Sequence, residues 1–129
     1  MNIRIVSLKI RFSDGEFHQN TEEDFSVFFE KLAAEKDLPT TSQPSPEEFL
    51  ELYEEAKDAG EEVLVITLSS GLSGTVNAAN LAKQMAEYEK IWIVDSEQAI
   101  ITQRFLVQRA VKMRKEGRVW KRLSHVLKI

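Results

Sequence analysis

The sequence predicts a single α/β domain over residues 1–129, built on a parallel sheet with helices on both faces. Two apolar runs carry this prediction, residues 62–68 and 90–95, because continuous apolar stretches are typical of strands buried on both sides. Helical patterns alternate with these strands, and such alternation is typical of parallel strands joined by crossovers. Ligands of such sheets bind outside the carboxyl ends of the strands, so a site is expected at that edge.

The first 45 residues are expected to supply a hairpin and a helix. The β-branched stretch 2–12 predicts a strand, Asp14-Gly15 a turn, and the "EFH" that follows a short return strand. A capping-box pattern before phenylalanines at helical spacing predicts a helix over residues 21–37. Residues 38–45 are expected to form a loop.

Start and stop signals define the remaining helices. Ser45 is a good N-cap before a proline, and Gly60 is a typical helix end. Ser96 is expected to cap a helix that ends at Gly117. The predicted helices cover residues 46–59, 76–88, 97–116 and 118–129.

The stretch 67–75, "TLSSGLSGT", places hydroxyl side chains and two glycines around one leucine at the carboxyl end of a predicted strand. One interpretation is a plain strand-to-helix turn in which Ser73 or Thr75 caps the helix. The other is an oxyanion cradle, in which N–H groups at a helix N-terminus and hydroxyls donate to an anion that the helix dipole favours. The turn has no Walker lysine, which argues against a nucleoside triphosphate, whereas a carboxylate fits.

Composition excludes several function classes. The formal net charge of −4 argues against nucleic-acid binding, which normally uses a basic excess. Cysteine is absent, so thiolate chemistry and disulfides are excluded. The first residues do not resemble a signal peptide, and no apolar run approaches the roughly 20 residues of a membrane helix. We therefore expect a cytoplasmic protein without a metal site or cofactor.

Three segments together resemble the DegV family of fatty-acid-binding proteins: "PTTSQPSPEEFLELYEEAKDAG", "VLVITLSSGLSGTVNAANLA" and "IWIVDSEQA". The similarity extends from roughly residue 5 to residue 117. It implies an α/β amino-terminal domain and a fatty acid held between it and a carboxyl-terminal domain. Some members of the family carry the lipid for bacterial fatty acid kinase, so the resemblance implies a binding protein and a kinase activity located in a separate protein.

The resemblance also implies the ligand-binding residues. Thr41, in the "TSQP" motif, and Ser73, in "SSGLSG", match the two hydroxyls that hold the fatty-acid carboxylate in the family. Two neutral hydroxyls with helix-terminal N–H groups bind a carboxylate without a buried counter-charge. The full set of expected ligand-binding residues is Thr41, Ser73, Ser42, Ser70, Gly71, Gly74 and Thr75.

The chain departs from the family pattern at both ends. It resembles only the amino-terminal domain, starting at the family's second strand and ending before the carboxyl-terminal domain. His18 and His125 match no family site residue, and Arg104 either faces the acyl path or solvent. We expect exposed apolar surface that drives self-association, as a homodimer, or association with a separately encoded second half. The residues expected on this surface are Leu72, Val76, Ile100, Ile101 and Phe105.

Two other functions are compatible with the sequence. One is an interaction or structural module whose lipid site has lost its function. The other is a small phosphoryl- or acyl-transfer domain that uses the same anion cradle, although no nucleophile–base pair stands out in the sequence.

Overall fold

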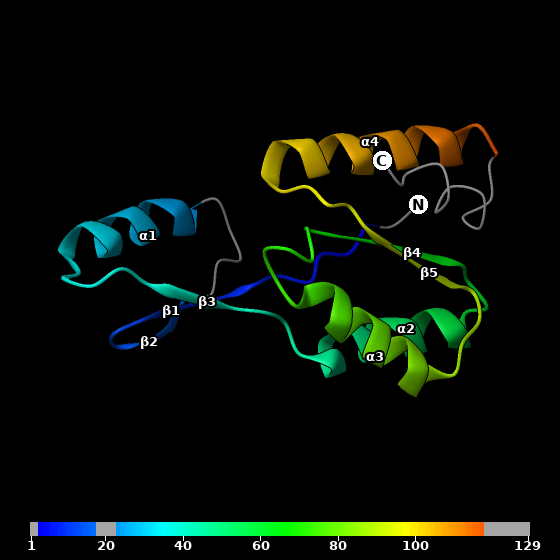
Figure 1. The fold of residues 1–129 in the computed structure, drawn as a ribbon, viewed down its shortest axis with the longest axis horizontal. Coiled ribbons are helices and arrows are strands. Elements are labelled where there is room, and N and C mark those ends of the chain that lie inside the picture. Colours follow the sequence, from blue (N-terminus) through cyan, green and yellow to red (C-terminus); the bar gives the residue numbers. More distant parts are fainter. Residues whose placement is uncertain (1–2, 18–22, 118–129) are drawn as a thin grey trace. The chain divides into compact units, whose positions relative to one another are not determined.

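The computed structural model describes residues 3–17 and 23–117 and consists of two compact units, Met1–Pro44 and Ser45–Ile129 (Figure 1). The helix predicted over residues 118–129 lies outside the described residues, as do His18 and His125. None of the described helices is both long enough and apolar enough to cross a membrane.

The first unit contains a three-stranded antiparallel sheet in the order β2-β1-β3. Strand β1 (Lys9–Phe12) pairs with β2 (Gly15–Phe17) across a two-residue turn, as the hairpin signal predicts. The strand predicted over residues 2–12 is therefore shorter than expected. Helix α1 (Glu23–Ala34) lies within the predicted helix 21–37.

One expectation for this unit was wrong. The stretch predicted as a loop contains a short strand, β3 (Thr40–Ser42), which pairs antiparallel with β1 through Ile10 and Thr41. Strand β1 therefore has an antiparallel neighbour on each side, β2 and β3. The two-residue turn explains the β1–β2 pairing, because so short a connection can join only antiparallel neighbours.

A small aromatic core holds α1 on the hairpin. The rings of Phe12, Phe17 and Phe28 lie with centroids 5.6–5.9 Å apart in edge-to-face or tilted arrangements. Phe12 is buried, with 4% of its surface exposed. Three phenylalanines thus form the centre of a unit too small for a larger core.

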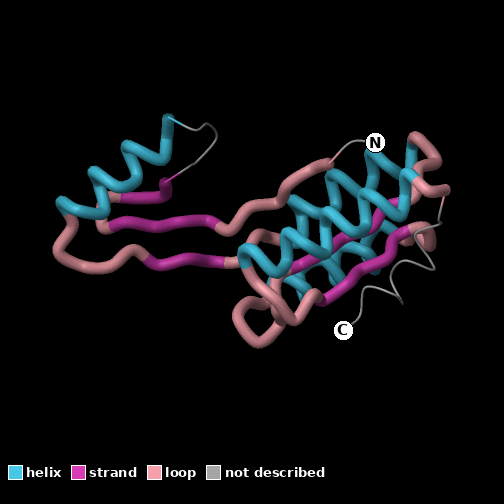
Figure 2. The backbone as a smooth tube through the Cα atoms, turned by 90° about the horizontal axis from the view of Figure 1, so that it is seen from above, coloured by secondary structure: helices cyan, strands magenta, loops and turns pink. Residues whose placement is uncertain are grey.

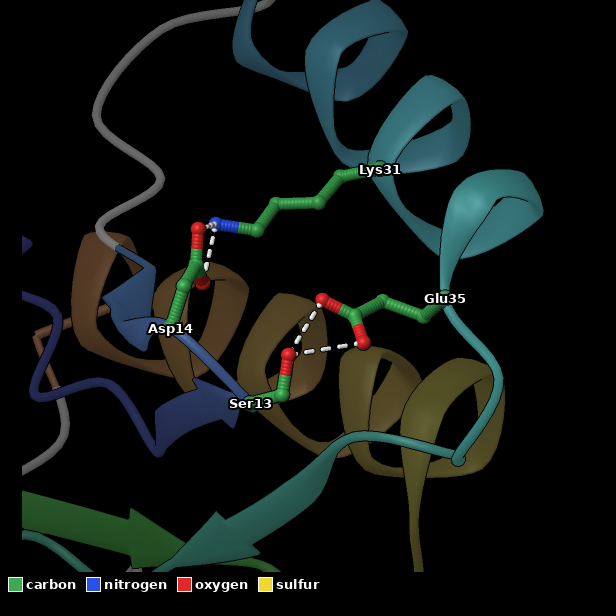
Figure 3. Close-up of polar contacts among 4 residues, drawn as sticks. All are labelled: Ser13, Asp14, Lys31 and Glu35. Atoms are coloured by element: carbon green, nitrogen blue, oxygen red, sulfur yellow. Dashed lines mark hydrogen bonds and ion pairs between the residues drawn. The ribbon is translucent and has the colours of Figure 1, made fainter.

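Two polar contacts join the hairpin turn to the end of α1 (Figure 3). The Lys31 ammonium lies 2.6 and 2.7 Å from the two carboxylate oxygens of Asp14. The Ser13 hydroxyl donates to the Glu35 carboxylate at 2.8 Å. Hydrogen bonding from Lys31 is the main reason that the pKa of the Asp14 carboxyl lies below its ordinary value.

The second unit is an α/β layer arrangement. Strands β4 (Val63–Thr67) and β5 (Ile91–Asp95) pair in parallel, with Thr67 opposite Asp95 at the carboxyl edge. Helix α4 covers one face of this pair and two helices cover the other (Figures 1 and 2). The helices are α2 (Pro46–Asp58), α3 (Thr75–Ala86) and α4 (Ile100–Lys115). This arrangement confirms the predicted fold class.

Alternate strand residues face the two layers. Towards α4, Val94 packs with Leu106, Ala110 and Met113 in a buried cluster. The partly buried Trp92 packs against this cluster. On the other side, small residues of α3 such as Ala79, which is fully buried, let α2 approach closely. The continuous apolar strands follow from this two-sided burial.

The ends of the helices are predicted unequally well. Helix α2 starts after Ser45, as expected, and Gly60 follows it in the left-handed region at φ 68°. Helix α4 starts at Ile100, three residues later than expected, and its N-cap is Ala99 instead of Ser96. The Ser96 hydroxyl is used in the preceding loop, where it accepts from the Gln98 N–H at 3.1 Å.

Candidate functional site

The hydroxyl-rich stretch forms the connection between β4 and α3, at the carboxyl edge of the parallel strands. Its fold depends on the Ser69 carbonyl, which accepts the N–H groups of Leu72 at 3.0 Å and Ser73 at 3.1 Å. The Ser69 hydroxyl also accepts the Gly71 N–H at 3.2 Å. A compact turn therefore presents Ser73 at the first turn of α3.

Ser73 and Thr75 interact with each other. The Ser73 hydroxyl oxygen lies 2.9 Å from the Thr75 hydroxyl oxygen and accepts the Thr75 N–H at 3.3 Å. Gly74 is the N-cap residue, so the interpretation that Ser73 or Thr75 occupies this position was wrong. Thr75 is buried as the first residue of the helix, whereas Ser73 is half-buried. Of the two, the Ser73 hydroxyl is thus the more accessible.

Two backbone N–H groups at the N-terminus of α3, those of Gly74 and Val76, are available to a ligand. Among the residues that the structure describes, neither the Gly74 N–H nor the Val76 N–H has a hydrogen-bond acceptor. Both belong to the first turn of a helix of 12 residues, where the macrodipole places partial positive charge. An anion would satisfy groups that the protein itself leaves open.

Other predicted ligand groups are already engaged within the protein. The Gly71 N–H is bonded to Ser69, and the Ser70 N–H donates to Asp95 at 3.2 Å and 3.3 Å from its two carboxylate oxygens. Ser70 and Gly71 are exposed. Their backbone N–H groups therefore serve the fold of the turn.

Asp95 lies next to the turn and is not among the residues predicted to bind the ligand. It ends β5 opposite Thr67 and also accepts the Glu97 N–H at 3.0 Å. Hydrogen bonding from Ser70 is the main reason that the pKa of the Asp95 carboxyl lies below its ordinary value, while desolvation opposes the shift. The Glu97 N–H lowers this pKa further.

The second hydroxyl motif lies in the first unit. Thr41 and Ser42 are exposed residues of β3, where Thr41 pairs with Ile10 and Ser42 with Lys9. The turn that carries Ser73 belongs to the second unit. The structure thus describes the two predicted hydroxyl groups on separate units, and their joint use remains a prediction.

Large apolar side chains are exposed near the turn and at the start of α4. They are Leu72, Ile100, Ile101 and Phe105, with 70%, 85%, 65% and 62% of their surfaces exposed. Val76, expected in the same group, is half-buried. Arg104 is exposed, whereas its neighbour Gln103 donates to the Ile66 carbonyl at 3.3 Å. No group of three or more potential metal ligands occurs among the described residues.

Comparisons with known proteins agree on one family. A DegV domain-containing protein of Staphylococcus aureus is 36% identical over 118 residues, which are 90% of this chain and 41% of the relative. A Thermotoga maritima structure, described as revealing a fatty acid binding function, is 31% identical with a TM-score of 0.81 and covers 93% of this chain and 44% of that one. The chain thus spans less than half the length of these relatives.

A further solved structure contains a bound fatty acid. The Streptococcus pneumoniae fatty acid kinase B3 protein, loaded with linoleic acid, is 25% identical with a TM-score of 0.78 and covers 93% of this chain and 43% of that one. The sequence model of the DegV family matches residues 1–128. This chain therefore belongs to the DegV family.

Proposed function

We propose that the chain binds a long-chain fatty acid and holds its carboxylate at the N-terminus of α3. The observation that carries this proposal is the pair of uncommitted N–H groups, Gly74 and Val76, beside the accessible Ser73 hydroxyl. These groups are neutral donors in the positive end of a helix dipole, which suits a single negative charge. The family membership supports the proposal that this negative charge is the carboxylate of a fatty acid.

The neighbouring apolar surface suits an acyl chain. Leu72 belongs to the turn itself, and Ile101 and Phe105 follow on the first turns of α4. A methylene that leaves water for such a surface contributes about 0.8 kcal/mol when fully buried. Carboxylate recognition by the turn and chain recognition by these residues together specify an amphipathic anion.

Thr41 is proposed as a second carboxylate ligand. Its hydroxyl is exposed on β3, and the motif that contains it matches the family. Like Ser73 it is neutral, so it adds a donor without adding a charge. Its contribution is separable by mutation because it lies on a different unit from Ser73.

We further propose that the chain is a carrier and that phosphorylation of the bound carboxylate is performed by a separate kinase protein. The likeness to a fatty acid kinase B3 protein supports this assignment. The exposed apolar residues at the start of α4 support association with a second copy or with another chain that covers them.

Lipid binding is tested by native mass spectrometry of the purified chain, before and after incubation with oleate, with organic extraction to identify any lipid bound on purification. The variant Thr41→Ala/Ser73→Ala is expected to remain folded and to lose the oleate adduct. The matched control is Thr40→Ala/Thr102→Ala, which removes one exposed hydroxyl from each unit, Thr40 being the strand neighbour of Thr41.

The outcomes separate the possibilities. Lipid on the wild-type chain and on the control, but not on the double variant, would support the proposed site. Lipid on all three would place the carboxylate elsewhere. A wild-type chain that remains empty after incubation with oleate would overturn the function. The same spectra report whether the lipid-bound species is a monomer or a dimer.

A further inference from the structure

The loops after β4 and β5 are fastened to each other at the carboxyl edge of the sheet. Besides the Asp95 contacts, the Ser69 N–H donates to the Gln98 carbonyl at 2.8 Å, and the Ser96 N–H donates to the Thr67 carbonyl at 3.2 Å. These bonds join residues nearly 30 positions apart in the sequence. The hydroxyl turn is therefore held from outside by the neighbouring loop.

Asp95 connects the turn to the neighbouring loop through an ionised side chain. Its Oδ1 atom accepts both the Ser70 N–H at 3.2 Å and the Glu97 N–H at 3.0 Å. A hydrogen bond to a carboxylate is roughly twice as strong as one between neutral groups. One oxygen atom thus connects the two loops.

The loop that carries this carboxylate is strained. Glu97 has φ 52°, in the left-handed region that costs a residue other than glycine roughly 1–2 kcal/mol. The Asp95–Glu97 contact is a local turn of the kind that aspartate stabilises. Strained conformations persist where surrounding contacts define them and occur often at functional sites.

From these contacts we infer that Asp95 is a positioning residue, whose carboxylate fixes the hydroxyl turn in the form that receives the ligand. This inference rests on the proposed function. Asp95 acts through Ser70: with Ser70 held, Ser69 keeps its carbonyl on Leu72 and Ser73, and Ser73 stays at the helix N-terminus. Asp95 does not itself bind the ligand, because one carboxylate repels another.

The mechanism makes a sharp distinction between two substitutions. Asp95→Asn keeps an Oδ1 acceptor for both N–H groups, so the turn retains its geometry and binding stays within about threefold of wild type. Asp95→Ala removes both bonds, and binding weakens about tenfold or more. Glu89→Ala is the matched control, because Glu89 is an exposed carboxylate just before β5, at the opposite end of the strand.

The test uses the ¹⁵N-labelled chain and octanoate, a soluble fatty acid, as the probe. Amide chemical shifts give the affinity, and hydrogen exchange of the Ser70 and Ser73 amides without ligand gives the order of the turn. Faster exchange and weaker binding in Asp95→Ala, with both restored in Asp95→Asn and unchanged in Glu89→Ala, would support the inference.

Two results would overturn it. If wild type and Asp95→Ala bind octanoate equally, the turn does not need Asp95, although the proposed function survives. If the wild-type chain binds neither octanoate nor oleate, the proposed function fails, and the exchange rates of the Ser70 and Ser73 amides alone test the role of Asp95. Unchanged exchange in Asp95→Ala then refutes the positioning role, whereas faster exchange supports Asp95 as the residue that orders the turn.

Discussion

The Ser73–Thr75 contact allows a quantitative test of how the turn is built. Ser73→Ala removes the acceptor of the Thr75 N–H, and the loss of one such hydrogen bond costs about 1 kcal/mol. It also removes the partner of the Thr75 hydroxyl, on a residue only 5% exposed, which costs about 1 kcal/mol more. We therefore expect Ser73→Ala to lower the free energy of unfolding by about 2 kcal/mol.

Thr75→Val deletes only the hydroxyl–hydroxyl contact and should cost about 1 kcal/mol. In the double variant that contact is lost only once, so the combined cost stays near 2 kcal/mol and the coupling energy is about 1 kcal/mol. The assay is urea unfolding in a Trp120→Phe background, followed by the fluorescence of Trp92, which packs against the core of the second unit. Single effects that add to within about 0.3 kcal/mol would refute the reasoning.

Three further predictions concern the two units separately. Ile91→Ala, at a fully buried position of β5, should lower the unfolding free energy by about 3 kcal/mol in urea, while Ile101→Ala, at an exposed position, should change it by less than about 0.5 kcal/mol; equal effects would contradict the assigned core. Glu97→Gly should relieve left-handed strain and raise stability by about 1 kcal/mol in thermal unfolding, and a loss of stability would count against that strain. Pairing with Lys31 lowers the pKa of Asp14 in the folded state, so the pair stabilises the first unit above the ordinary pKa of 3.8. This stabilisation is lost as the pH falls through the lower pKa of the folded state. Lys31→Met should move the Asp14 titration, followed by NMR, back up towards 3.8, and an unchanged titration would exclude the pairing.

The second unit could be predicted from the sequence because its signals are local and strong. The strands β4 and β5 are apolar runs that only two-sided burial explains, and Gly60 follows α2 where a left-handed residue is needed. The position of the hydroxyl turn at the carboxyl edge follows directly from the strand-to-helix order.

Other features depend on tertiary contacts that no local pattern contains. Strand β3 is three residues long, too short to show a period, and exists because Thr41 pairs with Ile10. Helix α4 begins later than predicted because the side chains of Asp95 and Ser96 accept hydrogen bonds from the backbone of the loop before it, and not from the helix N-terminus. The contact between Asp95 and Ser70 spans 25 residues, so only the parallel register of β4 and β5 brings it about.

These contacts also bear on the anion site proposed for the turn. The donors available to a ligand are the Ser73 hydroxyl and two backbone N–H groups, all of them neutral, so attraction comes from oriented dipoles instead of a countercharge. Dipoles attract an anion more strongly when they need not reorient, so a mobile turn would lose affinity even with every donor still present. A charged side chain that holds the turn through its backbone N–H groups, as Asp95 does, therefore favours anion binding more than a charged side chain within the site would.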